Sequence, residues 1–323
     1  MSRPIVFMAP GQGVQYAGMG GSLYAGNKGF RGLMDQSLQQ FESEWTSRIA
    51  TIIRHPERVI ESDLEDCRIT HPLVFTVHYA LGALLQAHGI RPTHVLGYSL
   101  GELVASVLSG ALSLEDGMKI ALETGAWVHE NTPPAGMMAI FASPEVQADY
   151  YPYFEGVATA CHNFPDHFVV SGRREELALI ADQLTPDGIH CEMLPIRRGF
   201  HSPDMDPFQI KAANWAHERP DHWRKGSIPQ YSCALGRELT SADLTYHHLG
   251  RVHRRPVLFQ STFRKIDQEL QPRFIDLSVS GTLAAFARKL VPRARTGDIL
   301  SLQSRFGDGN TQFERFLQTW SSE

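Results

Sequence analysis

The sequence predicts an α/β protein with one large domain and a smaller inserted subdomain, and three observations lead to this prediction. Over the first third of the chain, short apolar runs that stop at glycine turns alternate with segments of helical spacing. The middle of the chain then changes to closely spaced strands and helices. The length of 323 residues, 42% of them hydrophobic and 20% charged, exceeds what one core normally supports in a globular protein.

The first third begins with a buried strand and contains a long buried helix. Residues 4–9 form a nearly continuous apolar run that ends at the turn Pro-Gly-Gln-Gly. Apolar residues at helical spacing predict a helix over residues 70–88, and the glycine that follows is a typical stop signal. A strand over residues 95–98 and a helix over residues 99–108 come next. Two further segments are helical or irregular, residues 14–26 and residues 30–41.

The middle of the chain predicts the inserted subdomain. Its segments follow the order strand, helix, strand, strand, helix, strand, at residues 137–142, 144–151, 157–160, 168–171, 173–184 and 189–195. This is the split βαβ, or ferredoxin-like, arrangement. We therefore expect a small subdomain over residues 133–198, with residues 1–132 and 199–323 forming the large domain.

The last third predicts further elements of the large domain. Helices are expected over residues 205–217 and 281–290, and strands over residues 228–233 and 274–277. Residues 246–255 are polar and rich in histidine, so a solvated surface loop is the expectation there.

Charge and hydropathy exclude several classes of protein. With 30 basic and 35 acidic side chains, the chain lacks the basic surplus of a nucleic-acid binder. The most membrane-like stretch, residues 73–85, is shorter than a bilayer span and contains His78, so it predicts a buried helix. The apolar run at residues 5–9 is too short for a secretory signal. The sequence thus predicts a cytoplasmic protein without a membrane or nucleic-acid partner.

The cysteines predict neither a metal centre nor a redox site. They lie far apart without a C-x-x-C pair, at Cys67, Cys161, Cys191 and Cys233. We expect reduced thiols and no bound metal.

The strongest chemical signal is the sequence Gly-Tyr-Ser-Leu-Gly at residues 97–101. It follows an apolar strand and opens a helix, which is the context of a nucleophilic serine on a sharp turn. The first turn of such a helix also directs backbone N–H groups at an oxyanion. This pattern nominates Ser99 as a nucleophile.

A serine needs a general base, and a histidine is the usual one. In an α/β-hydrolase the base would follow late in the chain, which nominates His247, His248 or His253. These three are also the only plausible metal cluster, but their crowding in a polar segment favours a solvated surface.

Four motifs together resemble the malonyl-CoA:acyl-carrier-protein transacylase family, which includes discrete acyltransferases and acyl hydrolases of polyketide assembly lines. Residues 9–15, APGQGVQ, resemble its F-P-G-Q-G-x-Q, and residues 97–101 match its G-H-S-L-G except at Tyr98. Residues 199–203, GFHSP, match its A-F-H-S-P, and the segment beginning at Asn163, NFP followed by VVSG, resembles its N-x-P and V-I-S-G. The likeness covers nearly the whole chain in order.

The resemblance implies a fold and a set of site residues. The family fold is an α/β-hydrolase-like large domain that carries a ferredoxin-like subdomain, with the site in the cleft between them. Ser99 would then be the nucleophile and His201 the base. The backbone N–H groups of Gln12 and Leu100 would form the oxyanion hole. Backbone carbonyls, expected near residues 278–280, would orient the histidine in place of a carboxylate.

The resemblance also implies ping-pong acyl transfer. Ser99 would attack an acyl thioester, and a second thiol or water would resolve the acyl-enzyme. The thioester would arrive on the phosphopantetheine arm of an acyl carrier protein or of coenzyme A, and no permanently bound cofactor is expected.

The sequence departs from the family at the residue that binds malonyl. The family places an arginine 25 residues after the serine, where this chain has Thr124, and the glycine that follows is kept as Gly125. A hydroxyl cannot replace a bidentate guanidinium. Loss of about 3 kcal/mol would lower malonyl turnover about a hundredfold. We therefore expect a non-carboxylated acyl group, unless Arg197 or Arg198 supplies the cation.

Two further pocket positions bear on the acyl group. Tyr98 replaces the usual histidine before the nucleophile, which affects the shape of the pocket that Asn163 and Phe200 are expected to line. Gly199 would leave room for a larger acyl group, and a tight backbone turn explains that glycine equally well.

Several functions are compatible with these departures. The leading hypothesis is an editing hydrolase that unloads acyl groups from acyl carrier proteins, and the close competitor is an acyltransferase for a non-malonyl group. The sequence also leaves open malonyl transfer with a relocated cation, a non-catalytic carrier-docking subunit and a lipase-like hydrolase. Intact Ser99 and His201 speak against the docking subunit.

Overall fold

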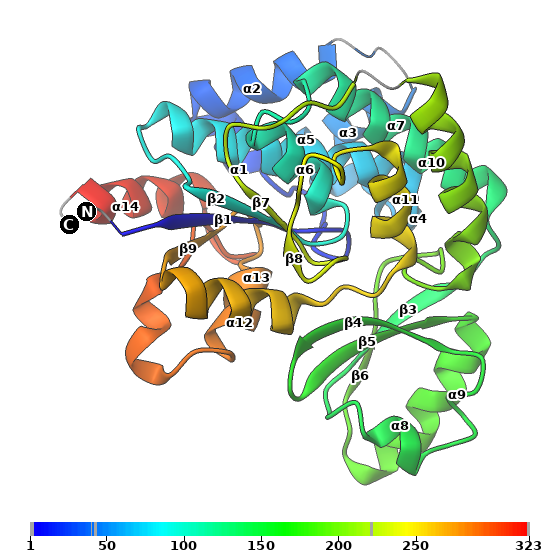
Figure 1. Cartoon of the computed structure of the whole chain (residues 1–323). Helices are drawn as coiled ribbons and strands as arrows, with labels where there is room; N and C mark the ends of the chain where they lie inside the picture. Colours follow the sequence, from blue (N-terminus) through cyan, green and yellow to red (C-terminus); the bar gives the residue numbers. More distant parts are fainter. Residues whose placement is uncertain (1–2, 40, 42–43, 220–221, 322–323) are drawn as a thin grey trace.

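The computed structural model describes residues 3–39, 41, 44–219 and 222–321 of the chain, and these form two sheets with their own helices (Figure 1). The larger sheet lies in the upper part of Figure 1 and the smaller one below it, at the right. None of the helices in these ranges is long and apolar enough to cross a membrane.

The larger sheet has six strands in the order β10-β9-β1-β2-β7-β8. All neighbours are parallel except the last pair, which is antiparallel. The strands are β1 Ile5–Ala9, β2 His94–Gly97, β7 Gln230–Ser232, β8 Arg237–Glu238, β9 Arg273–Asp276 and β10 Ile299–Ser301. Because parallel strands end at one edge, the turns after β1 and β2 lie side by side, with Ala9 in register with Gly97.

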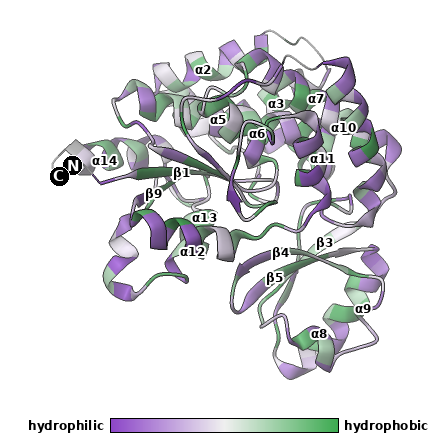
Figure 2. Cartoon of the chain, in the orientation of Figure 1, coloured by the Kyte–Doolittle hydropathy of each residue, from purple (hydrophilic) through white to green (hydrophobic). Residues whose placement is uncertain are grey.

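Helices cover both faces of this sheet (Figure 1). The central one is α5, which is buried along most of its length, as predicted from its apolar spacing. In Figure 2 the central strand β1 is hydrophobic, whereas the outer helices α2 and α12 mix hydrophilic and hydrophobic residues. The helices of this part are α1 Gly21–Gly26, α2 Lys28–Gln39, α3 Glu44–Arg54, α4 Glu61–Glu65, α5 Cys67–Ala87, α6 Gly101–Leu108, α7 Leu114–Asn131, α10 Asp206–Glu218, α11 Tyr246–Arg254, α12 Phe259–Leu270, α13 Thr282–Arg288 and α14 Gly309–Ser321.

The smaller sheet is antiparallel, with the strand order β4-β5-β3-β6. Its elements are β3 Gly136–Ile140, α8 Val146–Asp149, β4 Ala158–Phe164, β5 His167–Gly172, α9 Arg174–Leu184 and β6 Cys191–Met193. A separate core that includes Met138, Phe168 and Leu177 joins the sheet to its helices. This β-α-β-β-α-β order is the ferredoxin-like arrangement that the sequence predicts. The limits of the subdomain at residues 133 and 198 stay predictions.

The expectation of a polar loop over residues 246–255 is wrong. The segment forms helix α11, which buries Tyr246, Leu249 and Val252 together with His248 and His253. These residues recur at helical spacing, so the buried face is continuous. His248 and His253 belong to that buried face. Counting histidine as a hydrophilic residue breaks the apolar pattern, so the sequence does not predict the helix. The sequence patterns also give no range for α3, α12, α14 or β10.

Candidate active site

Ser99 lies on the sharp turn between β2 and α6. Its backbone is left-handed, with φ 53°, which directs the side chain away from both elements. A Cβ atom on Gly101 would collide with the carbonyl of Ala9, and one on Gly97 would collide with Glu102. Glycine is therefore required at both positions because the turn packs directly on the neighbouring backbone.

His201 faces Ser99 from the segment before α10. Its Nε2 lies 2.8 Å from Ser99 Oγ. Its Nδ1 lies 2.8 Å from the carbonyl oxygen of Arg255, to which the ring donates. With Nδ1 protonated, Nε2 carries the lone pair and can accept the proton of the serine hydroxyl. This is the geometry that a serine nucleophile and its general base require, and the roles of the two residues stay predictions.

The carbonyl that orients His201 does not lie at residues 278–280, where the sequence predicts it. In that segment Ser278 bonds to Asp276, and Ser280 Oγ lies 2.7 Å from Thr282 Oγ1. The carbonyl of Arg255 follows the last turn of α11 instead. A backbone carbonyl orients His201, as expected. The sequence does not predict its position, because that position depends on helix α11, where the sequence predicts a loop.

Burial sets the protonation state of His201. The side chain lies in the interior, and loss of solvation lowers its pKa to about 4. The neighbouring ring of His253 acts in the same direction. The imidazole is therefore neutral at pH 7, as a general base must be.

Gln12 lies next to the nucleophile after β1. Its side-chain Nε2 donates to Thr70 Oγ1 at 2.5 Å, and its Oε1 lies 3.1 Å from His71 Nε2. These contacts from α5 fix the turn that bears the Gln12 backbone. Leu100 precedes the first turn of α6. That the N–H groups of Gln12 and Leu100 form an oxyanion hole stays a prediction.

A cavity of about 40 Å³ lies beside Ser99 and His201, between the two sheets. The small sheet contributes Met137, Cys161 and Val169, and the chain after β6 contributes Leu194 and Ile196. The remaining lining residues are Gln12, Tyr98, Ser99, Phe200 and His201. The side chains from the small sheet and from the chain after β6 form an apolar wall, and neither lysine nor arginine lines the cavity among the residues that the structure describes.

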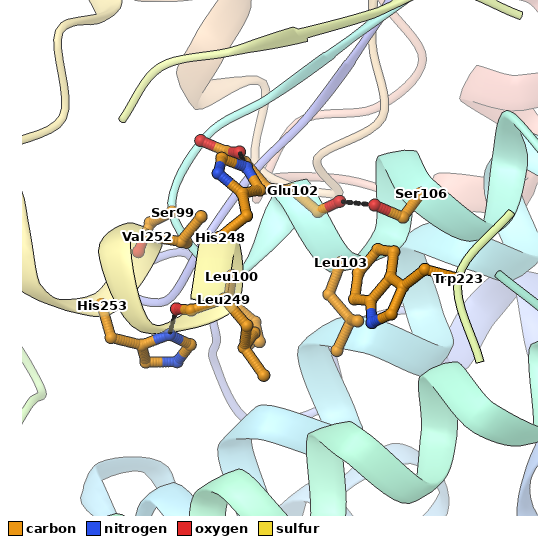
Figure 3. Close-up of a pocket in the computed structure, with 10 residues that line it drawn as sticks. All are labelled: Ser99, Leu100, Glu102, Leu103, Ser106, Trp223, His248, Leu249, Val252 and His253. Carbon is orange, nitrogen blue, oxygen red and sulfur yellow. Dashed lines mark hydrogen bonds and ion pairs between the residues drawn. The ribbon is translucent and has the colours of Figure 1, made fainter. Parts of the chain in front are cut away.

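A second, smaller cavity of about 10 Å³ borders Ser99 on the side of α6 and α11 (Figure 3). Figure 3 shows Glu102 joined to His248, and His253 joined to the carbonyl of Leu249, by hydrogen bonds. The other lining residues are Leu100, Leu103, Ser106, Trp223 and Val252. Within the ranges that the structure describes, no lysine or arginine lines this cavity either.

Tyr98 and Asn163 join the nucleophile turn to the small sheet. The Tyr98 hydroxyl donates to Asn163 Oδ1 at 2.9 Å, and Asn163 Nδ2 donates to His167 Nδ1 at 3.0 Å. All three side chains are buried. The tyrosine that departs from the family thus has a defined partner across the cleft.

Gly199 and Phe200 play different structural roles. A Cβ atom on Gly199 would collide with the carboxylate of Asp204, so close packing of the backbone explains this glycine. Gly199 lines neither cavity beside Ser99, whereas Phe200 lines the larger one.

Thr124 lies on α7, is only 1% exposed and lines neither cavity. Its hydroxyl has no hydrogen-bond partner among the residues that the structure describes. Arg197 and Arg198, the two candidates for a cation that would replace the missing arginine, have other partners. Arg197 pairs with Glu65, and Arg198 donates to the carbonyls of Arg197 at 2.9 Å and His129 at 2.6 Å.

Within the described ranges, one group places three potential metal ligands within 4.8 Å of one another, and it consists of Asp66, Cys67 and His129. Arg68 already binds the Asp66 carboxylate, and the Cys67 thiol donates to the carbonyl of Gly125 at 3.2 Å. Burial raises the pKa of Cys67 to about 12. A thiol that stays protonated is a poor metal ligand.

The sequence patterns miss several residues of the site. Glu102, the next residue after the Gly-Tyr-Ser-Leu-Gly sequence, is buried, and His71 holds Gln12. Alternation along the small strands could have nominated the apolar wall, but which face points at Ser99 depends on how the two sheets pack.

The chain belongs to the acyl transferase domain family, which it matches over residues 6–319. The resemblance seen in the motifs is thereby confirmed. Among its relatives is the polyketide biosynthesis acyltransferase homolog PksD of Bacillus subtilis, 33% identical over 296 residues, which are 90% of this chain and 89% of that protein. The homolog BaeD of Bacillus velezensis is 33% identical over 316 residues, covering 98% and 96% of the two chains.

Solved structures have the same fold. A loading acyltransferase from the avermectin modular polyketide synthase superposes with a TM-score of 0.86 at 26% identity, covering 98% of this chain and 99% of that one. Malonyl CoA-acyl carrier protein transacylase from Clostridium perfringens gives a TM-score of 0.78 at 23% identity, with coverage of 99% and 98%. The second likeness concerns the fold alone.

Proposed function

We propose that this protein hydrolyses non-carboxylated acyl thioesters of acyl carrier proteins in polyketide-type biosynthesis, as an editing enzyme. The observation that carries the proposal is that, among the described residues, neither cavity beside Ser99 is lined by a lysine or an arginine. The buried, neutral Thr124, at the position where the resemblance implies the malonyl-binding arginine, agrees with it. The names of the relatives PksD and BaeD support the biosynthetic setting.

The proposed reaction uses Ser99 and His201. Ser99 Oγ attacks the thioester carbonyl while His201 Nε2 takes its proton across the 2.8 Å hydrogen bond. The imidazolium then gives that proton to the thiolate of the phosphopantetheine arm as the carbon–sulfur bond breaks, so the arm leaves as a thiol. Water then attacks the acyl-enzyme while His201 takes one of its protons. The imidazolium returns that proton to Ser99 Oγ as the acyl–oxygen bond breaks, and the free acid leaves. The carbonyl of Arg255 keeps the ring oriented in each step.

The walls of the site support a non-carboxylated acyl group. A carboxylate moved out of water needs a cation or several hydrogen-bond donors. In the described part of the chain no lysine or arginine lines either cavity beside Ser99, and both Arg197 and Arg198 have other partners. The apolar wall formed by Met137, Val169 and Leu194 suits an acetyl or longer alkyl group instead.

Two other functions within the family differ from hydrolysis of non-carboxylated thioesters. One differs in the group that attacks the acyl-enzyme, and the other differs in the acyl group that is transferred to Ser99. An acyltransferase would discharge Ser99 onto a second carrier thiol rather than onto water. A malonyl transferase would load the carboxylated group. A protein kept only to dock carriers would form no acyl-enzyme.

The test is intact-protein mass spectrometry with malonyl-, acetyl-, butyryl- and hexanoyl-carrier proteins. We expect Ser99 to be acylated by the non-carboxylated groups, with free carrier and free acid as the products and little transfer to a second carrier. Exclusive malonylation of Ser99 would overturn the choice of substrate. Discharge only onto a second carrier would replace hydrolysis by transfer.

Matched variants locate the chemistry. Ser99→Ala should form no acyl-enzyme. Ser261→Ala changes an exposed serine on α12 that lines neither cavity beside Ser99, and it should retain turnover. A wild-type protein that no carrier acylates would favour the docking function.

A further inference from the structure

A buried hydrogen bond links the helix of the nucleophile to the helix beside the base. Glu102 and His248 are each 2% exposed, and Glu102 Oε2 accepts from His248 Nε2 at 2.6 Å (Figure 3). Glu102 Oε1 accepts from Ser232 Oγ at 2.8 Å and from the backbone N–H of Ala234 at 3.0 Å. The carboxylate thus ties α6 both to the end of β7 and to α11.

The last turn of α11 holds His201 through backbone groups. The backbone N–H of His201 donates to the carbonyl of His253 at 2.8 Å. The ring Nδ1 donates to the carbonyl of Arg255, the residue directly after the helix, at 2.8 Å. A displacement of α11 would therefore move His201 relative to Ser99.

The Glu102–His248 pair is not explained by stability alone. His248 Nδ1 is buried without a partner among the described residues. A buried nitrogen without a hydrogen-bond partner destabilises the fold, and buried ionisable pairs are often replaceable by apolar residues without loss of stability. A function in fixing geometry accounts for a pair that packing alone would not favour.

We propose that the Glu102–His248 hydrogen bond is a positioning device that locks α11 against α6 and so holds His201 Nε2 at the Ser99 hydroxyl. The inference rests on the proposed serine–histidine chemistry. In a Ser-His-Asp triad the carboxylate binds the base directly. Here a carboxylate acts one helix away, through the α11 backbone. A shift of about 1 Å in such a geometry lowers a rate by up to a hundredfold.

Two substitutions of His248 separate positioning from packing. His248→Phe keeps a ring in the core and removes the donor to Glu102. His248→Gln loses the ring but places an amide N–H where Nε2 stood. Packing predicts that the phenylalanine variant is the more active one, and positioning predicts the opposite order.

The readout is the rate at which a fluorophosphonate probe labels Ser99, followed by mass spectrometry. This rate reports the reactivity of the serine and does not depend on which acyl group is the natural substrate. We expect His248→Phe to label about ten- to a hundredfold more slowly and His248→Gln to stay within about threefold of the wild type. In acyl-carrier turnover, the loss should fall on kcat with KM unchanged.

Controls make the result unambiguous. His78→Phe changes another buried histidine, on α5 and outside the link, and should label at the wild-type rate. Should His248→Phe fail to fold, Glu102→Asp withdraws the carboxylate by one methylene and should slow labelling about tenfold.

Wild-type labelling of His248→Phe, or equal losses in the two His248 variants, would overturn the inference. The proposed hydrolysis could still stand in that case. Conversely, a chain that hydrolyses no acyl carrier but shows the expected order of labelling would overturn the proposed function alone.

Discussion

At position 124 the chain has a single hydroxyl group, where the resemblance to the family predicts a cation. Thr124 is 1% exposed, and its oxygen has no partner among the described residues. Gly125 beside it packs against the carbonyl of Cys67, which fixes the register of α7 against α5. We therefore expect the side chain at position 124 to influence which acyl group Ser99 accepts.

We expect Thr124→Arg to increase malonylation of Ser99 by about tenfold or more, because a guanidinium can pair with the malonyl carboxylate. The measurement is the initial rate of Ser99 acylation by malonyl-carrier protein in mass spectrometry. Thr124→Met, similar in length but neutral, is the matched control and should show no gain. An arginine variant that folds and gains nothing would mean that position 124 does not face the acyl group.

The pKa of His201 gives a second prediction at this scale. In the proposed mechanism the neutral ring of His201 is the base, so protonation ends activity, and a pKa lowered to about 4 moves that loss to low pH. The labelling rate of Ser99 should be nearly equal at pH 8 and pH 6. A base with an ordinary pKa of about 6.5 would lose about three quarters of its rate at pH 6. A midpoint near 6.5 would contradict the burial argument.

At the scale of the element, the turn between β2 and α6 is set by close backbone packing. Gly97 and Gly101 leave no room for a side chain, and the φ of 53° at Ser99 depends on that turn. Backbone strain of this kind persists only where the surroundings hold it.

We expect Gly101→Ala to lower the melting temperature by several degrees and to abolish labelling of Ser99, since its Cβ would collide with the Ala9 carbonyl. The control is Gly32→Ala on the exposed face of α2, where nothing lies within 4 Å of the new Cβ. That change should raise stability by roughly 0.5–1 kcal/mol. Thermal unfolding of both variants is the measurement, and an unchanged Gly101→Ala would refute the packing argument.

Helix α11 shows why an element can be misjudged from sequence. Its histidines read as polar, yet His248 and His253 lie on the same buried face as Leu249 and Val252. A histidine is buried readily when it is neutral and hydrogen-bonded, as His253 Nδ1 is to the carbonyl of Leu249. Hydropathy alone does not contain that information.

At the scale of the whole molecule, five buried histidines share a lowered pKa. Loss of solvation lowers the pKa of His78 to about 3 and those of His167, His201 and His253 to about 4. The pKa of His71 is also held well below its usual value. In the unfolded chain each would titrate near 6.5.

Stability should therefore fall as the pH falls below about 6.5. In that range these histidines bind protons in the unfolded chain but stay neutral in the folded chain. The free energy of unfolding therefore falls by roughly 1 kcal/mol per histidine for each pH unit. Asp276 acts in the opposite direction, because burial raises its pKa to about 6 and it gains a proton first in the folded state. Burial also raises the pKa of Asp204, which acts in the same direction as Asp276, and the two carboxyl groups offset only part of the effect of the five histidines.

Urea unfolding at pH 8, 7, 6 and 5 tests this prediction, with a decrease expected only below pH 7. His78→Leu is the informative variant, since neither nitrogen of His78 has a partner among the described residues. It should be more stable at pH 8 and less sensitive to acid. A free energy of unfolding that does not change between pH 7 and pH 5 would contradict the assignment of these histidines as neutral.

The sequence by itself determined the family, the ferredoxin-like order of the small sheet and the pairing of Ser99 with His201 as candidates. These features depend on the identity of the side chains and on their spacing along the chain, both of which can be read directly from the sequence. Only the tertiary structure decided that the carbonyl of Arg255 orients His201, which residues wall the cavities, and that Glu102 reaches His248 across 146 positions of the chain. A backbone carbonyl is the same at every residue and leaves no signal in a sequence. Its role depends on which segments pack together, and packing is decided by the whole fold.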